Sequence, residues 1–240
     1  MSSNIKTIRI CILDNMMINQ YNINIGDIPF LYTERIYMTI FYKLHDKLYV
    51  NITNACSCSC VFCIRKGGDG VGDADSLWLE REPSLDEIKE AFDKRDLDGV
   101  SEVVFCGYGE PLERADITVS VCEYIKSKCA LPVRLNTNGL AELINPGFDI
   151  SRLAVFDAVS ISLNAADEDA YLKITRPKFG AGAYQAMLNF SLKVKKYTDV
   201  TFTAVDIIGQ AQVEACVKIA ESMGIPLRIR GFVGDNASYS

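Results

Sequence analysis

The sequence lacks several features that would assign it to common classes of protein. It has no run of about 18 apolar residues, so no membrane span is expected. It has no basic run, and its formal net charge of −6 argues against a nucleic-acid partner. It also lacks the N-terminal pattern of a signal peptide. Because its thiols are clustered rather than arranged as a framework of regular pairs, we expect a cytoplasmic protein.

Other absences limit the chemistry. His45 is the only histidine, so a catalytic histidine is not expected, and this residue is interpreted as structural or exposed. The glycine-rich stretch 67–72 is not followed by the Lys-Ser/Thr pair of a phosphate-binding P-loop. A structural zinc site would require a second closely spaced cysteine pair, and none follows the first cluster. The chemistry must therefore rest on other residues.

The cysteines are the most informative feature that is present. Four of the nine lie within residues 56–63, and they include a C-x3-C-x2-C spacing formed by Cys56, Cys60 and Cys63. Three thiolates suit a cubane [4Fe–4S] cluster and leave one iron able to bind a small molecule. The spacing alone leaves two alternatives open, which are a zinc site and a closed cluster that also uses Cys58.

The pattern of apolar residues predicts an α/β fold. A chain of 240 residues that is 49% hydrophobic fits one domain with a sizeable core. Short apolar runs predict strands near 47–53, 101–106, 133–137, 157–163, 200–206 and 227–231, after a lead-in strand near 38–44. Amphipathic segments predict helices near 85–96, 117–129, 167–174, 184–196 and 210–223. We therefore expect a partial (βα)6 TIM-like barrel, with a parallel sheet and outer helices.

The first residues differ from the rest of the chain. Residues 1–37 are rich in Asn and Ile, have poor periodicity and carry no motif. We predict an N-terminal extension of uncertain role over 1–37 and a core domain over 38–240. Either the extension is a genuine family-specific segment, or Met38 is the working start of the protein.

Three expected strands end in polar or glycine-containing motifs. These are Gly-Tyr-Gly-Glu-Pro at 107–111, Asn-Thr-Asn-Gly at 136–139 and Ser-Ile-Ser-Leu-Asn at 160–164. Glycines allow a backbone to approach a ligand closely, and the alternation of a strand places the two serines and the asparagine of the third motif on one face. The first two motifs are also common turn sequences, so a plain turn is the alternative for each. Their position at strand ends favours a binding site, because α/β folds bind ligands there.

The cysteine spacing, with Phe62 just before the last cysteine, resembles that of the radical S-adenosylmethionine (SAM) superfamily. The resemblance covers about residues 38–232. It implies a [4Fe–4S] cluster on Cys56, Cys60 and Cys63, whose open iron is chelated by the amino and carboxylate groups of SAM. It further implies reductive cleavage of SAM to a 5′-deoxyadenosyl radical.

The resemblance also implies roles for the strand-end residues. Gly109 and Glu110 would meet the amino group of SAM, although Tyr108 replaces a glycine of the family's Gly-Gly-Glu-Pro-like segment. The other implied residues contact the methionine, ribose or carboxylate parts: Thr137, Asn138, Ser160, Ser162, Asn164 and Arg176. For Arg176 an ordinary surface arginine is an equal alternative.

The order of motifs is most similar to that of the TatD-associated radical SAM proteins, a subgroup whose name implies no reaction. A short barrel with an open side would suit a peptide or protein substrate. The family implies an electron donor such as flavodoxin or ferredoxin. The rival hypothesis is a non-catalytic iron–sulfur electron-transfer or metal-binding module, which would hold a fully ligated cluster and bind no SAM.

Overall fold

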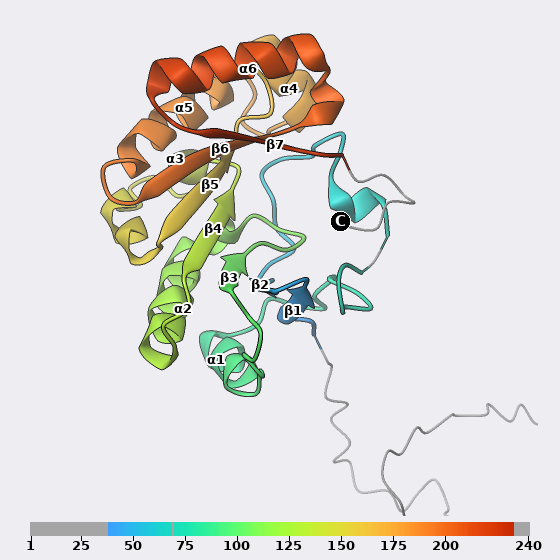
Figure 1. Ribbon diagram of the computed structural model, residues 1–240, viewed down its shortest axis with the longest axis vertical. Coiled ribbons are helices and arrows are strands. Elements are labelled where there is room, and N and C mark those ends of the chain that lie inside the picture. Colours follow the sequence, from blue (N-terminus) through green and yellow to red (C-terminus); the bar gives the residue numbers. More distant parts are fainter. Residues whose placement is uncertain (1–37, 69, 233–240) are drawn as a thin grey trace, which may run out of the picture. The chain divides into compact units, whose positions relative to one another are not determined.

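The computed structural model describes residues 38–68 and 70–232, and the extension predicted for residues 1–37 lies outside them. The described residues form one seven-stranded sheet whose strand order follows the chain (Figure 1). Its strands are β1 (Phe41–Leu44), β2 (Lys47–Val50), β3 (Glu102–Phe105), β4 (Val133–Thr137), β5 (Ala158–Ser162), β6 (Asp199–Val205) and β7 (Leu227–Arg230). β1 pairs with β2 in the antiparallel sense, and every later pair is parallel. The lead-in strand and the six parallel strands expected from the sequence are confirmed.

Helices connect the parallel strands and cover one face of the sheet (Figure 1). They are α1 (Leu85–Asp93), α2 (Ala115–Lys128), α3 (Ala141–Ile144), α4 (Glu168–Thr175), α5 (Ala183–Val194) and α6 (Gln210–Met223). Short 3-10 turns are η2 (Ile64–Lys66), η3 (Pro111–Arg114), η4 (Ile150–Val155) and η5 (Asp206–Ile208). At the start of α1, Ser84 and Glu87 form a reciprocal capping box. This repetition of strand and helix around a parallel sheet is the expected partial barrel.

The two faces of the sheet differ in chemistry. Side chains alternate between the faces, and the helix-covered face carries the apolar core. That core includes Val103, Phe105, Leu135, Val159, Ile161 and Phe202. The strand register places a mostly polar set on the opposite, inner face: Tyr49, Arg134, Asn136, Ser160, Thr201 and Thr203. The inner face of this barrel is therefore suited to a polar ligand rather than to a packed apolar layer.

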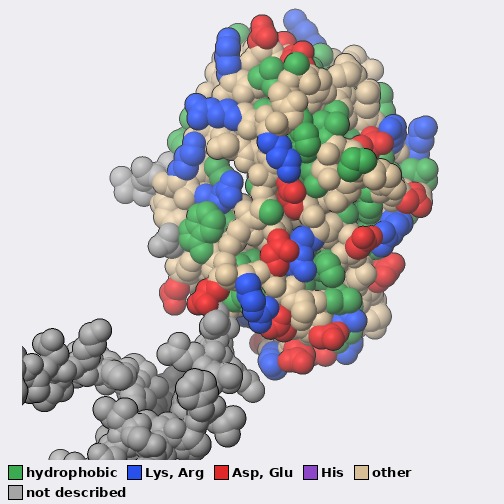
Figure 2. All heavy atoms as spheres, turned by 180° about the vertical axis from the view of Figure 1, so that it is seen from behind, with side chains coloured by type: hydrophobic (Ala, Val, Ile, Leu, Met, Phe, Trp, Pro, Cys, Tyr) green, Lys and Arg blue, Asp and Glu red, His purple; other side chains and the backbone are tan. Residues whose placement is uncertain are grey.

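The surface carries no sign of a membrane span. Within 38–68 and 70–232, none of the helices combines the length and the apolar character needed to cross a bilayer. Acidic and basic side chains are interspersed over most of the face drawn in Figure 2. His45 is exposed in the turn between β1 and β2, with a φ of 55°, so it lies in an exposed position as expected.

Candidate functional site

The cysteine-rich loop follows β2 and is held by the end of α4. The backbone N–H of Ser59 donates to the carbonyl of Thr175 at 3.0 Å, and that of Val61 donates to Ile174 at 2.9 Å. Cys58 also forms an isolated antiparallel bridge with Pro177. An irregular loop cannot satisfy its own backbone, so these contacts with a distant helix fix its path.

The four thiols of the loop lie in different environments. Cys56, Cys60 and Cys63 are half-buried, whereas Cys58 is only 5% exposed and belongs to the apolar core. Every cysteine in the described part of the chain is a free thiol. The arrangement separates the three cysteines of the C-x3-C-x2-C spacing from the fourth.

Electrostatics reinforces this separation. The Cys58 S–H donates to Cys60, which holds the pKa of Cys60 below its usual range and raises the pKa of Cys58. Burial raises the pKa of Cys56 to about 12. Arg65 donates its Nε–H to Cys63 Sγ at 3.4 Å. Cys58 is thus the thiol that keeps its proton, and Arg65 brings a positive charge to the loop.

The donor set fits an iron–sulfur cluster better than a single metal ion. Across residues 38–68 and 70–232, no three His, Cys, Asp or Glu side chains gather around one ion position. A zinc site requires such convergence on one ion. In a cubane cluster each thiolate binds its own iron, so the three sulfurs lie further apart. Three free thiols on one loop supply the soft ligands that such a cluster needs.

The Gly-Tyr-Gly-Glu-Pro turn packs directly on the start of the cysteine loop. A Cβ on Gly107 would lie 2.1 Å from Asn51 Oδ1, and one on Gly109 would lie 2.2 Å from the carbonyl oxygen of Thr53. The backbone N–H of Glu110 donates to Ala55 O at 2.8 Å. The glycines therefore allow the end of β3 to approach the chain that follows β2, a role that the sequence analysis had given to a ligand.

Glu110 joins two strand ends. Its side chain is buried, and Oε1 accepts hydrogen bonds from Leu112 N at 3.0 Å and from the Thr137 hydroxyl at 2.7 Å. Oε2 accepts from Asn138 N at 2.7 Å. Burial raises the pKa of Glu110 to about 7, although these three donors favour the carboxylate. A carboxyl group with this pKa loses its proton readily when a cation binds beside it.

Asn138 extends the connection to the cysteine loop. Its Nδ2 donates to Ser57 Oγ at 3.0 Å, and its Oδ1 accepts from Leu140 N at 2.9 Å. The cysteine loop, the end of β3 and the end of β4 are therefore linked by one hydrogen-bonded network. The sequence predicted Glu110, Thr137 and Asn138 of this network at two separate strand ends, and the structure joins them to Ser57.

Asn164 lies just beyond β5 with an unusual backbone and an unsatisfied oxygen. Its φ is 55°, its side chain is 2% exposed, and its Oδ1 accepts no hydrogen bond from the residues that the structure describes. Buried amide oxygens normally have a partner, so this one requires an explanation. Ser160 is buried and Ser162 half-buried on the same strand. Such an oxygen fits a ligand with a hydroxyl donor, such as the ribose of SAM.

Phe62 and Arg176 are the remaining predicted residues of the site. Phe62 is half-buried in the cysteine loop. Arg176 is exposed at the end of α4 with a φ of 47°, and its carbonyl accepts the Ser59 N–H at 3.2 Å. The guanidinium of Arg176 forms no ion pair within residues 38–68 and 70–232. The backbone of Arg176 supports the loop, whereas its side chain is not drawn into the network.

Several residues that support the site are not among those predicted from the sequence. Tyr108 is buried, and its hydroxyl donates to Gly68 O at 2.5 Å while its ring meets the edge of Trp78. The replacement of a glycine by Tyr108 therefore ties the glycine-rich loop to the end of β3. Ser57 and Arg65, described above, are further examples. The only signal for Ser57 and Arg65 in the sequence is their position beside the cysteines.

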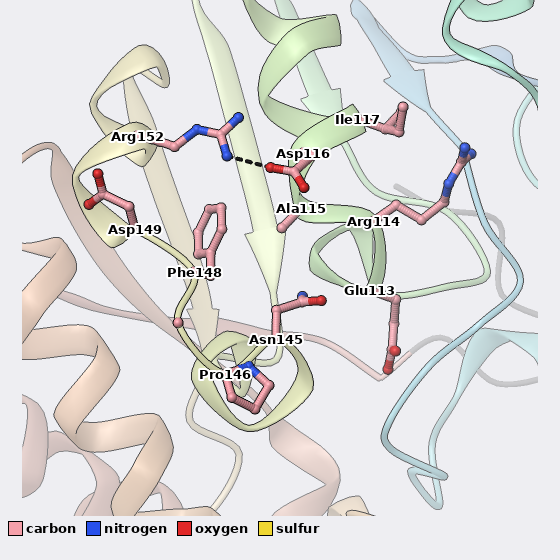
Figure 3. Close-up of a pocket in the computed structure, with 11 residues that line it drawn as sticks. Glu113, Arg114, Ala115, Asp116, Ile117, Asn145, Pro146, Phe148, Asp149 and Arg152 are labelled. Atoms are coloured by element: carbon pink, nitrogen blue, oxygen red, sulfur yellow. Dashed lines mark hydrogen bonds and ion pairs between the residues drawn. The ribbon is translucent and has the colours of Figure 1, made fainter.

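A cavity adjoins this network without including Ser57, Glu110, Thr137 or Asn138 in its lining. It has a volume of about 530 Å³ and is lined by residues of η3, the start of α2, the 145–149 loop and η4 (Figure 3). Asp116 and Arg152 form an ion pair at its edge. None of the predicted site residues lines it. The network at the strand ends, rather than this cavity, is the candidate site.

A profile described as the radical SAM superfamily matches residues 50–226, which include the cysteine loop and β3 to β6. The chain belongs to the radical SAM superfamily. Among curated proteins it is similar to the GTP 3',8-cyclase of Lactiplantibacillus plantarum, with 36% identity over 56% of this chain and 38% of that protein. It is also similar to the probable GTP 3',8-cyclase of Methanocaldococcus jannaschii, with 30% identity over 67% of this chain and 48% of that protein. The chain thus spans less than half the length of these two relatives.

Solved structures support the fold of this radical SAM protein. The structure of anSMEcpe with bound AdoMet has a TM-score of 0.51 and 16% identity, and the match covers 78% of this chain and 51% of that one. The structure of TYW1 with a lysine-pyruvate adduct has a TM-score of 0.52 and 18% identity, and covers 87% and 73%. Family membership makes the chain a radical SAM enzyme and implies a [4Fe–4S] cluster and SAM as cofactors. It favours the enzyme over a non-catalytic iron–sulfur module.

Proposed function

We propose that this enzyme holds its [4Fe–4S] cluster through Cys56, Cys60 and Cys63 and binds SAM across the ends of β2 to β5. The observation that carries the proposal is the network from Ser57 through Asn138 to Glu110, which links the cysteine loop to the next two strand ends. When bound, the cluster would supply one electron that breaks a carbon–sulfur bond of SAM, releasing methionine and a radical that takes a hydrogen atom from the substrate.

The protein's own residues position and shield the reactants. Glu110 would face the ammonium of SAM, with its carboxylate oriented by Thr137 and Asn138. Asn164 would accept a hydrogen bond from a ribose hydroxyl through its unpaired Oδ1. Arg176, which is exposed, would have to swing inward to reach the SAM carboxylate. Gly109, Phe62, Ser160 and Ser162 remain predicted contacts of SAM.

The direct test is cleavage of SAM. The reconstituted and reduced full-length protein is expected to convert SAM slowly to methionine and 5′-deoxyadenosine, even without its substrate. Quantifying 5′-deoxyadenosine by chromatography checks this, and heat-denatured protein with the same iron is the control. A fully loaded, reducible protein that leaves SAM intact would contradict the proposal and favour the electron-carrier alternative.

Glu110 provides a second test, which measures the protons released when SAM binds. Because its pKa is raised to about 7, the carboxyl group is mostly neutral at pH 6. A neighbouring ammonium favours the charged form, so SAM binding should release close to one proton at pH 6 and almost none at pH 8.5. Since binding releases protons, SAM affinity should increase as the pH rises from about 6 to about 8.

Calorimetry in buffers of different ionisation enthalpy measures this proton release. Glu110→Gln should abolish it, whereas Glu123→Gln, at an exposed carboxyl on α2, should leave it unchanged. Equal proton release by the parent and the Glu110→Gln variant would remove Glu110 from the SAM site.

The free thiols, the motifs and the relatives bear on the electron donor, the compartment and the substrate. We propose that a flavodoxin or ferredoxin supplies the electron and that the protein works in the cytoplasm, since the cysteines of the described residues are free thiols. The resemblance to TatD-associated proteins rests on the order of the motifs. The open side of the barrel favours a peptide or protein substrate, but the relatives named for GTP support a small nucleotide-like substrate instead.

A further inference from the structure

Two arginines stand side by side on the last strand of the sheet. Arg228 and Arg230 are two residues apart on β7, so their side chains point to the same face. The register pairs Arg228 with Thr203 and Thr203 with Ser162, which places the arginines on the inner, polar face. β7 follows β6 at one edge of the sheet (Figure 1). Both arginines therefore border the open side of the barrel.

The positive charge of this region is not balanced. Arg134 and Lys47 both bind Glu102, at 2.8 and 2.9 Å respectively. Arg228 and Arg230 are exposed, and neither forms an ion pair within residues 38–68 and 70–232. Lys47 and Arg134 thus share one carboxylate, whereas Arg228 and Arg230 have no ion-pair partner among the described residues.

Neighbouring groups confirm that these cations share one environment. Desolvation, together with the guanidiniums of Arg134 and Arg230, lowers the pKa of Arg228. Asp206, just past the end of β6, accepts the Phe232 N–H at 2.7 Å and forms no ion pair with either arginine of β7. Arg228 and Arg230 are like charges without an ion-pair partner of their own, which is unfavourable, so an anionic ligand would stabilise this region.

Hydroxyl groups lie between the arginines and the candidate SAM site. Ser160, Ser162, Thr201 and Thr203 occupy the inner face of β5 and β6, and none of their hydroxyls hydrogen-bonds another described residue. At the end of β3, burial raises the pKa of Cys106, while its surroundings include Arg230 and Glu110. The arginines therefore lie within electrostatic reach of the proposed site of SAM.

We infer that Arg228 and Arg230 bind a phosphate group of the substrate. The guanidinium fork matches the oxygens of a phosphate and can donate two parallel hydrogen bonds, and the serine and threonine hydroxyls add further donors. The inference rests on the proposed function, because it places the remainder of the substrate along the inner face toward the radical. It narrows the substrate to a small phosphate-bearing molecule rather than a peptide.

Titration with inorganic pyrophosphate tests the inference without any SAM chemistry. The full-length protein, reconstituted with its cluster but without SAM or reductant, is titrated by calorimetry at low salt. Pyrophosphate should bind the parent, and Arg228→Gln and Arg230→Gln should each weaken binding about tenfold, the usual effect of losing one charge-assisted contact. Lys218→Gln removes one exposed positive charge from α6 and should have no effect.

The outcomes separate this inference from the proposed function. Absence of pyrophosphate binding by the parent, or equal binding by the parent and the double arginine variant, would overturn the phosphate site even if SAM is cleaved. Tighter binding of a tri-glutamate peptide than of pyrophosphate, lost in the same variants, would assign the arginines to a peptide carboxylate and also overturn it. Pyrophosphate binding that persists in a protein unable to cleave SAM would support the phosphate site while contradicting the proposed reaction.

Discussion

Replacing Cys60 with alanine is expected to abolish the iron–sulfur cluster. Each of Cys56, Cys60 and Cys63 would supply the only protein ligand of one iron, so a missing thiolate leaves two irons open. The Cys58 S–H already holds the pKa of Cys60 low, so Cys60 ionises more readily than Cys58. Iron and sulfide content after anaerobic reconstitution, together with the visible absorbance of the cluster, measures the effect. Cys56→Ala and Cys63→Ala should behave in the same way.

Cys58→Ala is the matched control because it removes a thiol from the same loop. Cys58 is 5% exposed and lies in the apolar core. Removing its sulfur atom leaves only a small cavity there. The variant should retain close to the parental iron content per folded protein. A complete loss of iron in Cys58→Ala, equal to that in Cys60→Ala, would show that all four cysteines bind the cluster and that no iron is open.

The sequence was sufficient for the fold because the signals of the fold are local. Strand runs such as 133–137 and amphipathic helices such as 210–223 are set by the spacing of apolar residues, and both appear at the expected positions. The capping box of Ser84 and Glu87 is equally local. The cysteine spacing belongs to the same class of signal, since all of its members lie on one short loop.

The contacts that assemble the site are long-range, so no local pattern of residues predicts them. Asn138 binds Ser57, which is 81 residues away, and Thr137 binds Glu110 across 27 residues. Nor does any local pattern show that the carbonyls of α4 hold the cysteine loop. The face of the sheet that carries Arg228 and Arg230 is equally unpredictable from the sequence. It is known only from the register between β7 and β6.

The glycine turn after β3 illustrates how a correct motif can be given an incomplete interpretation. A Gly-Tyr-Gly-Glu-Pro segment indicates that some group must come close to the backbone. The sequence suggested a ligand, whereas the structure places the backbone of Thr53 and Ala55 against Gly109. Gly109 is therefore required because protein backbone lies against it. Its first role is to stabilise the site, and any contact with SAM comes in addition.

Gly109→Ala is consequently expected to destabilise the protein severely. The new Cβ would lie 2.2 Å from Thr53 O and 2.6 Å from Ala55 O, and both are backbone atoms that cannot rotate away. Relieving the overlap would displace the chain leading into Cys56 and break the Glu110–Ala55 hydrogen bond of 2.8 Å. Overpacking and the loss of a buried hydrogen bond together predict a decrease of more than about 3 kcal/mol in the free energy of unfolding.

Urea denaturation of the cluster-free protein measures this decrease. Gly231→Ala is the control, because its added Cβ would meet nothing closer than Asp206 Oδ2 at 4.0 Å, and its stability should stay within about 0.5 kcal/mol of the parent. The displaced loop of Gly109→Ala should also lower iron uptake and SAM affinity, because the cysteines and Glu110 would lose their common support. A soluble Gly109→Ala variant with parental stability would mean that the β3 turn and the cysteine loop can separate at little cost. The network would then not hold the three strand ends together.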